Sequence, residues 1–352
     1  NNVDINGPVT LTANTTIKTD ANNGTIDFSD TIDGAFNLTL DSGAGDIGVG
    51  GAIGGSTPIK VLDINHGDGA GIITLAGGIG NQSTKASGTT SGSAVDIGNA
   101  ATASITLGKA SVSRVFSTDG ATEFTTTGTS PDIDLIGTGV EFQTSDNTLT
   151  FTGGAIHLAN DGANLTIGTG SGDITLTAIR GTDNETVSIT SSGTVNTKAI
   201  GNAHEIETVG IEGGLIKIGG NITTDGDGDV TLTGPVQLAV DNITIDTSSV
   251  DGKGSGDGGN VRFTDKLDSI SGQAYALTIT TKAGTVQVDD IIGSTTALGA
   301  LTINNNATDT GTITLNGIGD GTAPALGSAD VLIGSTGTTG MTLKGAFYDT
   351  GA

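Results

Sequence analysis

One long phrase occurs twice in this chain, at Asn37–Asn65 and at Ala276–Asn304, and the two copies align without a gap. Eleven of the aligned positions are identical. The apolar positions and several glycines persist, while the Asp, Lys, Gln and Ser residues between them vary. A more degraded third copy spans Asn164–Ile179. Such repetition predicts a modular array in which each copy supplies the same core positions.

A shorter period lies within each copy. Leu38 and Leu40 recur as Leu62 and Ile64, about two dozen positions further on. Apolar residues alternate with polar ones, which predicts short strands with one buried face. Turns such as DSGAGD separate the strands, because Gly and Asn accept positive φ. The sequence therefore predicts an all-β fold, a parallel β-helix (solenoid) with roughly 22–24 residues per coil.

The domain organisation predicted from these repeats is one continuous β-solenoid over residues 1–352. Related passages lie at about 7–80, 160–200 and 228–320, and protruding loops are expected at 81–93 and 251–260. The competing interpretation is an array of immunoglobulin-like sandwiches. The missing Trp landmark and a period far below the about 100 residues of one such domain argue against that alternative.

Composition supports a narrow core. The chain has 60 Gly, 8 Phe, 2 Tyr and no Trp, so 3% of its residues are aromatic. Large globular cores depend on aromatic side chains for much of their buried area. We expect instead a thin column of Val, Ile, Leu and Ala, into which aromatic rings do not fit easily. Thr, which is β-branched and polar, suits the outward positions.

The charge excludes several partners. A formal net charge of −25 argues against nucleic acid and against anionic membrane surfaces, both of which need clustered Lys and Arg. It favours solubility and the attraction of divalent cations. No apolar stretch is as long as a membrane-spanning helix requires, so we expect no membrane insertion. The absence of Cys is consistent with an oxidising, extracellular location.

The repeats resemble a known class of surface protein. NLTLDSGAGDIGVGGAIGG, VQVDDIIGSTTALGALTIN and GDVTLTGPVQL are similar to the repeat arrays of bacterial filamentous-haemagglutinin-like proteins and beta-strand-repeat adhesins. Such phrases cover most of the chain and fit most poorly at Ser83–Ser130. The resemblance implies a right-handed parallel β-helix that is exported across the bacterial outer membrane and forms a stalk or fibre. The amino-terminal secretion module of that family is not visible in this sequence.

Catalytic patterns are weak, and we expect no enzyme. Some β-helices cleave polysaccharides with a carboxylate pair and Arg or aromatic contacts to sugar. Here Arg is rare, the histidines are far apart, and carboxylate pairs are expected by chance in an Asp-rich solenoid. These residues are Arg114, Arg180 and Arg262; His66, His157 and His204; Asp132 and Asp134; Glu205 and Glu207; and Asp289 and Asp290. Gly-rich runs such as GAGDIGVGG superficially resemble nucleotide-binding loops. A nucleotide-binding loop is followed by a helix, whereas these runs are followed by further strand patterns.

The best metal candidate is the turn TTDGDGD. Asp225, Asp227 and Asp229 alternate there, and carboxylates in such an arrangement can converge on Ca²⁺. An EF-hand would need Glu at position 12 of the loop, where Val236 stands. The competing interpretation is a solvated Asp-Gly corner. The only cofactor expected from the sequence is therefore this candidate calcium ion.

Together these features predict an extracellular structural protein at the bacterial cell surface, a rod or fibre segment that mediates attachment or assembly. Expected partners are copies of itself or adjacent segments packed end to end, because an open β-helix end exposes unpaired strand edges. A host or neighbour-cell glycan or protein is the other expected partner. The alternatives are a carbohydrate-binding or carbohydrate-degrading β-helix and a calcium-dependent surface-layer or matrix component.

Overall fold

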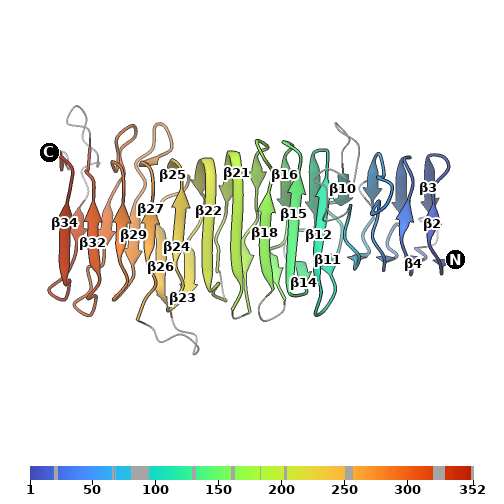
Figure 1. Cartoon of the computed structure of the whole chain (residues 1–352), viewed down its shortest axis with the longest axis horizontal. Coiled ribbons are helices and arrows are strands. Elements are labelled where there is room, and N and C mark those ends of the chain that lie inside the picture. Colours follow the sequence, from blue (N-terminus) through green and yellow to red (C-terminus); the bar gives the residue numbers. More distant parts are fainter. Residues whose placement is uncertain are drawn as a thin grey trace. The chain divides into compact units, whose positions relative to one another are not determined.

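The computed structural model is all-β, and its parallel strands stack in coils that form a β-solenoid (Figure 1). It describes residues 1–19, 23–65, 67, 69–80, 95–128, 132–159, 163–182, 184–201, 204–249, 257–319 and 330–349. The chain divides into two compact units, Asn1–Thr177 and Ala178–Ala352, called here the first and second unit. The single continuous solenoid over 1–352 stays a prediction.

Each coil of the first unit contributes up to three short strands, so three columns of parallel strands run through the unit. The first column contains β1 (Val3–Ile5), β4 (Ile26–Phe28), β7 (Ile47–Val49), β9 (Ile72–Leu75), β11 (Ser104–Gly108), β14 (Ile133–Ile136) and β17 (Ile156–Leu158). The second contains β2 (Val9–Thr10), β5 (Ile32–Asp33), single bridges at Ile53 and Ile79, β12 (Ser113–Thr118), β15 (Gly139–Thr144) and β18 (Asn164–Gly168). The third contains β3 (Thr15–Lys18), β6 (Leu38–Asp41), β8 (Leu62–Ile64), β10 (Val95–Gly98), β13 (Thr122–Thr125), β16 (Leu149–Thr152) and β19 (Ile174–Thr175).

The second unit repeats this plan. Its first column contains β20 (Ile179–Arg180), a bridge at Ile200, β23 (Ile222–Asp225), β26 (Ile243–Ser249), β29 (Leu277–Thr280), β31 (Leu301–Ile303) and β33 (Val331–Ile333). Its second contains β21 (Thr186–Thr197), β22 (Thr208–Ile218), β24 (Val230–Thr233), β27 (Val261–Phe263), β30 (Val286–Val288), β32 (Thr312–Leu315) and β34 (Gly340–Leu343). The third contains the later parts of β21 and β22, then β25 (Val236–Leu238), β28 (Leu267–Ser269) and bridges at Ile292, Ile318 and Tyr348.

Register explains the period in the sequence. Leu38 pairs with Leu62, so a core position of one coil stacks on the same position of the next. Coil length varies more than expected, because the step from Ile216 to its partner Val236 is much shorter than the step from Leu62 to its partner Val95. The long coils contain the predicted insertions. The loop 81–93 and residues 251–256 of the loop 251–260 lie outside the described residues.

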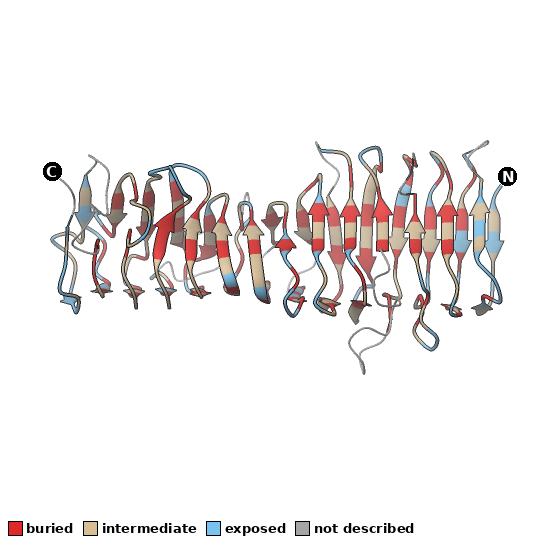
Figure 2. Ribbon diagram, turned by 90° about the horizontal axis from the view of Figure 1, so that it is seen from above, coloured by how far each residue is buried: buried red, intermediate tan, exposed pale blue. Residues whose placement is uncertain are grey.

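The core is a column of Ile, Leu and Val, as the alternation predicts. Buried residues alternate with intermediate or exposed ones along the strands (Figure 2), and Ile26, Leu40 and Ile279 are fully buried. The expectation that aromatic rings fit poorly is wrong. Six of the phenylalanines are buried: Phe28, Phe116, Phe124, Phe142, Phe151 and Phe263.

Four of these rings form one cluster in the first unit. Phe116 and Phe142 are register partners, as are Phe124 and Phe151, and each pair stacks with ring centroids 5.3 Å and 5.2 Å apart. Rings in different columns meet edge to face. Neighbouring strands lie about 4.8 Å apart, which is close to a ring-stacking distance. Rings on successive coils can therefore stack in register. Such a stack is not required, because the buried Phe28 has only aliphatic register partners.

The repeated phrase builds the same buried corner in both units. In the first unit the Ser42 amide donates to Oδ1 of Asn65 at 2.8 Å, and Nδ2 of Asn65 donates to Oγ of Ser42 at 3.0 Å. In the second unit Thr281 and Asn304 make the same two bonds at 2.7 and 2.8 Å. Thr281 and Asn304 occupy the positions in the second copy that Ser42 and Asn65 occupy in the first. The repetition in sequence is therefore a repetition of hydrogen bonding.

Close backbone approach explains several of the corner glycines. A Cβ on Gly45 would lie 2.3 Å from the carbonyl oxygen of Gly24, and a Cβ on Gly284 would lie 2.1 Å from that of Gly259. Neither Gly45 nor Gly284 has positive φ. The turn argument from positive φ therefore does not apply to these two positions, where glycine is needed because successive coils pack backbone against backbone.

Candidate functional site

The three aspartates of the predicted calcium turn are held in different ways. Asp225 ends β23, is 8% exposed, and its Oδ1 accepts the Gly226 amide at 2.6 Å. Asp227 and Asp229 are exposed. Oδ1 of Asp229 accepts the backbone amide of Asn260 at 2.6 Å and its Nδ2 at 3.0 Å. Within the described residues, these three do not form a group whose ligand atoms all lie within 4.8 Å of one another.

Asp229 therefore acts in a ladder between coils. Its partner Asn260 is in turn bonded to the next coil, because Oδ1 of Asn260 accepts the Thr285 amide at 2.9 Å. The exposed Asp227 and Asp229 are compatible with the solvated Asp-Gly corner that the sequence offered as the competing interpretation, whereas Asp225 is buried. Calcium binding at Asp225, Asp227 and Asp229 stays a prediction.

The other sequence candidates separate into scattered residues and one group. His66 lies outside the described residues, and His204 is exposed in the second unit. Glu205 and Glu207 flank the buried Ile206. The group joins Asp132, Asp134 and His157, each partly buried, whose ligand atoms all lie within 4.8 Å of one another.

Asp289 belongs to an ion pair on the second unit. Nη2 of Arg262 lies 2.7 Å from Oδ2 of Asp289, and Nε2 of Gln287 donates to Oδ1 at 2.5 Å. Partial burial raises the pKa of the Asp289 carboxyl, but hydrogen bonds from Gln287 and Arg262 and the charges of Arg262 and Lys344 outweigh it and hold this pKa below its ordinary value. Its neighbour Asp290 accepts the Ile291 amide at 2.8 Å. Asp289 and Asp290 thus make structural contacts, an ion pair and a backbone hydrogen bond.

One outward row follows the first column of the first unit. Its members are register partners on successive strands, and each except Asp4 lies between buried residues of its strand. The row consists of Asp4, Asp27, Gly48, Thr74, Thr106, Asp134 and His157. Neighbouring strands bring these side chains within about 5 Å of one another. The outward-facing side chains of this column therefore form a row that runs along the coil axis.

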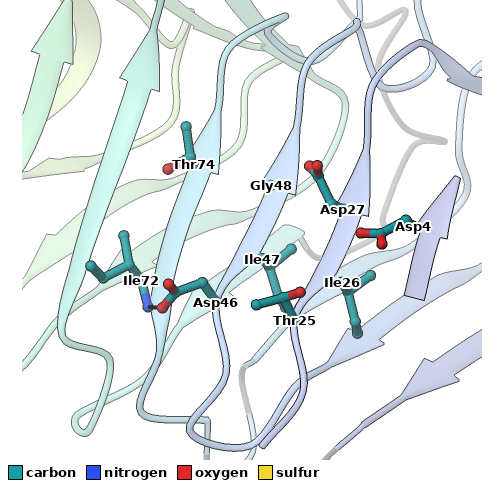
Figure 3. A pocket seen from close by; sticks show the side chains of 9 residues that line it. All are labelled: Asp4, Thr25, Ile26, Asp27, Asp46, Ile47, Gly48, Ile72 and Thr74. Carbon is teal, nitrogen blue, oxygen red and sulfur yellow. Dashed lines mark hydrogen bonds between the residues drawn. The ribbon is translucent and has the colours of Figure 1, made fainter. Parts of the chain in front are cut away.

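A shallow hollow of about 250 Å³ opens over the first part of this row (Figure 3). Asp4, Asp27 and Asp46 face it, and Gly48 leaves the space that a side chain would fill. Oδ1 of Asp46 accepts the Ile72 amide at 2.9 Å. Among the described residues, Asp4 and Asp27 have neither a hydrogen-bond nor an ion-pair partner. The hollow can attract cations, and its lining includes no Arg and no aromatic ring.

A second hollow of about 270 Å³ lies where β12, β15 and β18 adjoin. Arg114, Glu141 and Asn164 line it, and Gly139 leaves room between them. Nε of Arg114 donates to the carbonyl oxygen of Ala76 at 2.8 Å, which orients the guanidinium group. An Arg beside polar acceptors and donors is suited to a carboxylate or a sugar hydroxyl.

In comparisons with known proteins, no protein family, curated protein or solved structure matches the chain. No helix in the described ranges combines the length and the apolar character needed to cross a membrane. The fold itself identifies the chain as a parallel β-helix repeat protein.

Proposed function

We propose that this chain is a structural segment of a bacterial extracellular fibre or stalk, and that it works by extension and assembly. The observation that carries the proposal is that both copies of the repeated sequence form the same buried hydrogen-bonded corner. Ser42 and Asn65 form it in the first copy, and Thr281 and Asn304 form it in the second. A catalytic site needs one unrepeated arrangement of side chains. Here the repeated feature is a buried coil-to-coil contact, which lengthens a solenoid without adding chemistry.

The resemblance to filamentous-haemagglutinin-like and beta-strand-repeat adhesins supports a place at the cell surface. The charge supports it as well, because a chain with a net charge of −25 repels unspecific neighbours and stays dispersed until a complementary surface meets it. Attachment would then be made by loops or neighbouring segments that the fibre holds away from the cell.

The partner that fits this function best is another coil of the same kind. Met341 and Leu343 of β34 pair with the buried Ile313 and Leu315, yet they are 44% and 54% exposed. Core positions left open in this way favour the stacking of one more parallel coil, from an adjacent segment or from a second copy of the chain.

Electron microscopy and sedimentation velocity of the purified protein over a rising concentration series test this proposal. We expect end-to-end assemblies that Leu343→Lys reduces. The control Val240→Lys changes another exposed apolar residue, 38% exposed, and should leave assembly intact. A protein that stays monomeric at the highest concentration, or that assembles equally well with Leu343→Lys, would contradict end-to-end stacking at β34.

A parallel series with a calcium chelator tests the calcium-dependent alternative. If assemblies disperse on chelation and return with Ca²⁺, a matrix or surface-layer component becomes the better description. Assemblies that persist in the chelator would favour a fibre segment that assembles without calcium.

Glycan binding is the second candidate function, and the hollow at Arg114 and Glu141 favours it. An anionic oligosaccharide would place a carboxylate against the Arg114 guanidinium group. A glycan array should then show binding that Glu141→Gln changes and Glu123→Gln, on β13, does not. Equal signals from both variants would count against this hollow.

A further inference from the structure

Asp134 and His157 are brought together by the coil repeat of the first unit. Asp134 lies in β14 between the buried Ile133 and Leu135, and His157 lies in β17 between the buried Ile156 and Leu158. Alternation along a strand therefore turns both side chains outward. The two residues are register partners, and Nδ1 of His157 lies 2.8 Å from Oδ1 of Asp134.

Asp132 joins them from the same chain segment. It stands two positions before Asp134, so the period of an extended chain places both carboxylates on one face. Asp132, Asp134 and His157 each contribute a ligand atom to a group in which all such atoms lie within 4.8 Å of one another. The side chains of His157 and Asp134 are 20% and 35% exposed, so the group is partly shielded and still reachable from solvent.

We propose that Asp132, Asp134 and His157 form a binding site for a divalent transition-metal ion, for which Zn²⁺ is the probe. Two carboxylate oxygens and one imidazole nitrogen are ligands that Zn²⁺ accepts at about 2.0–2.2 Å, with water in the remaining position. Ca²⁺ and Mg²⁺ prefer oxygen ligands alone. The imidazole nitrogen therefore selects the class of ion.

Metal binding needs little movement of the coil. An ion bound between Nδ1 of His157 and Oδ1 of Asp134 would replace their hydrogen bond and separate the two atoms from 2.8 Å to about 3.4 Å. Side-chain rotation suffices for this, because the strands that carry them are already about 4.8 Å apart. The ion would join β14 to β17 and link two successive coils of the first unit.

The imidazole distinguishes this group from the other carboxylate clusters on the chain. Asp4, Asp27 and Asp46 at the hollow of Figure 3 offer oxygen atoms only. The aspartates of the predicted calcium turn also offer only oxygen. The inference is independent of the proposed fibre function, because a metal link between coils would serve any β-solenoid.

Isothermal titration calorimetry of chelator-stripped protein with ZnCl₂ tests the inference. We expect one site on the unmodified chain that His157→Ala and Asp134→Asn each weaken at least tenfold. His204→Ala, which removes an exposed imidazole in the second unit, is the matched control and should keep that site. A titration with CaCl₂ should show no binding at this group.

Imidazole NMR provides a second measurement that does not depend on the heat of binding and reports on each ring separately. The chain has 3 His, so single substitutions assign every ring. Zn²⁺ should shift the ring signals of His157 and leave those of His204 in place, and hydrogen exchange of β14 and β17 should slow on binding. Unchanged His157 signals, or equal Zn²⁺ affinity in His157→Ala and in the unmodified chain, would overturn the proposal.

Discussion

The coils around β12–β16 in the first unit and the coils of β29–β31 in the second unit build the same kind of parallel ladder with different core side chains. In the first unit, Phe116 stacks on Phe142 and Phe124 stacks on Phe151. In the second unit, Leu277 stacks on Leu301 and Ile279 stacks on Ile303. Both sets are fully buried or nearly so. A parallel in-register ladder thus accepts aromatic or aliphatic residues, and it also accepts mixed steps, since the buried Phe263 pairs with Leu232 and Val288.

This difference shows what limits the core. The ladder sets the distance between equivalent side chains at about 4.8 Å, and neither aliphatic nor aromatic stacks are strained by it. The ladder therefore constrains the spacing of the core side chains more than their size or type, since Phe28 lies between aliphatic register partners. The following predictions use matched changes in the two regions, from the largest expected effect to the smallest.

The largest effect is expected from the phenylalanine cluster. Phe142 contacts three other rings, so Phe142→Ala should cost about 3–5 kcal/mol of the free energy of unfolding of the first unit. Ile279→Ala, the aliphatic counterpart, should cost about 2–5 kcal/mol in the second unit. Hydrogen exchange by mass spectrometry would locate each loss. Loss of protection in both units from either single change would contradict the local character of the coils.

The buried corner should respond alike in both units. Asn65→Ala and Asn304→Ala each remove two hydrogen bonds and place Ala at a φ of 50° or 44°. Lost bonds and left-handed strain together should cost about 2–4 kcal/mol, measured by urea unfolding. Asn304→Gly removes the strain and not the loss of bonds, so it should cost about half as much. A large difference between the Asn65 and Asn304 variants would show that the two copies are not equivalent.

Close backbone packing predicts a smaller loss at a corner glycine. A Cβ on Gly284 would lie 2.1 Å from the Gly259 carbonyl oxygen, so Gly284→Ala should cost about 1–3 kcal/mol through displaced backbone. Gly48→Ala is the control, because its Cβ would meet only the movable end of the Asp27 side chain. Thermal unfolding should separate the two variants. Equal melting temperatures would argue against backbone crowding as the reason for glycine at this corner.

The smallest effect concerns the ion pair of Arg262 and Asp289. The pKa of the Asp289 carboxyl is lowered in the fold, so the pair stabilises the protein above the ordinary pKa of 3.8 and loses this contribution as pH falls through the lowered value. Asp289→Asn should cost less than about 1 kcal/mol at neutral pH and nothing at pH values below both pKa values. Urea unfolding at several pH values measures this.

Asp27→Asn is the matched change on the first unit. The passage GTIDFSDTID at 24–33 is similar to GNVRFTDKLD at 259–268, and Asp27 of the first aligns with Arg262 of the second. Asp27 lies opposite Asp4 and has no hydrogen-bond or ion-pair partner among the described residues. Removing one of two like charges should leave stability unchanged or raise it slightly. A pH-independent loss from Asp289→Asn, or a clear loss from Asp27→Asn, would contradict this account of the two surfaces.

Much of the fold could be predicted from the sequence because alternation and period are local. Leu38 and Leu40 with Leu62 and Ile64 gave both the strand face and the register, and β6 pairs with β8 at those residues. Coil length was less predictable. Insertions at corners change the number of residues between register partners, and pairing resumes beyond them, since Val230 still pairs with Val261.

The candidate site was predicted less well, for a physical reason. Alternate spacing marked Asp225, Asp227 and Asp229, but a turn directs such side chains apart. Asp134 and His157 are separated in sequence by one coil, and this interval was the signal that could have joined them. Residues one coil apart on a solenoid are neighbours whatever lies between them.

The sequence by itself determined that this chain forms coils of parallel strands with an Ile, Leu and Val core, because period-two alternation within a repeated phrase leaves few other ways to bury those residues. Only the tertiary structure decided which side chains meet across coils: the stacked phenylalanines, the bonds of Asn65 and Asn304, and the group of Asp132, Asp134 and His157. Those contacts depend on which residues of successive coils lie in register. The register in turn depends on the lengths of the loops between strands and on the hydrogen bonds between coils, neither of which can be read from the sequence of one strand.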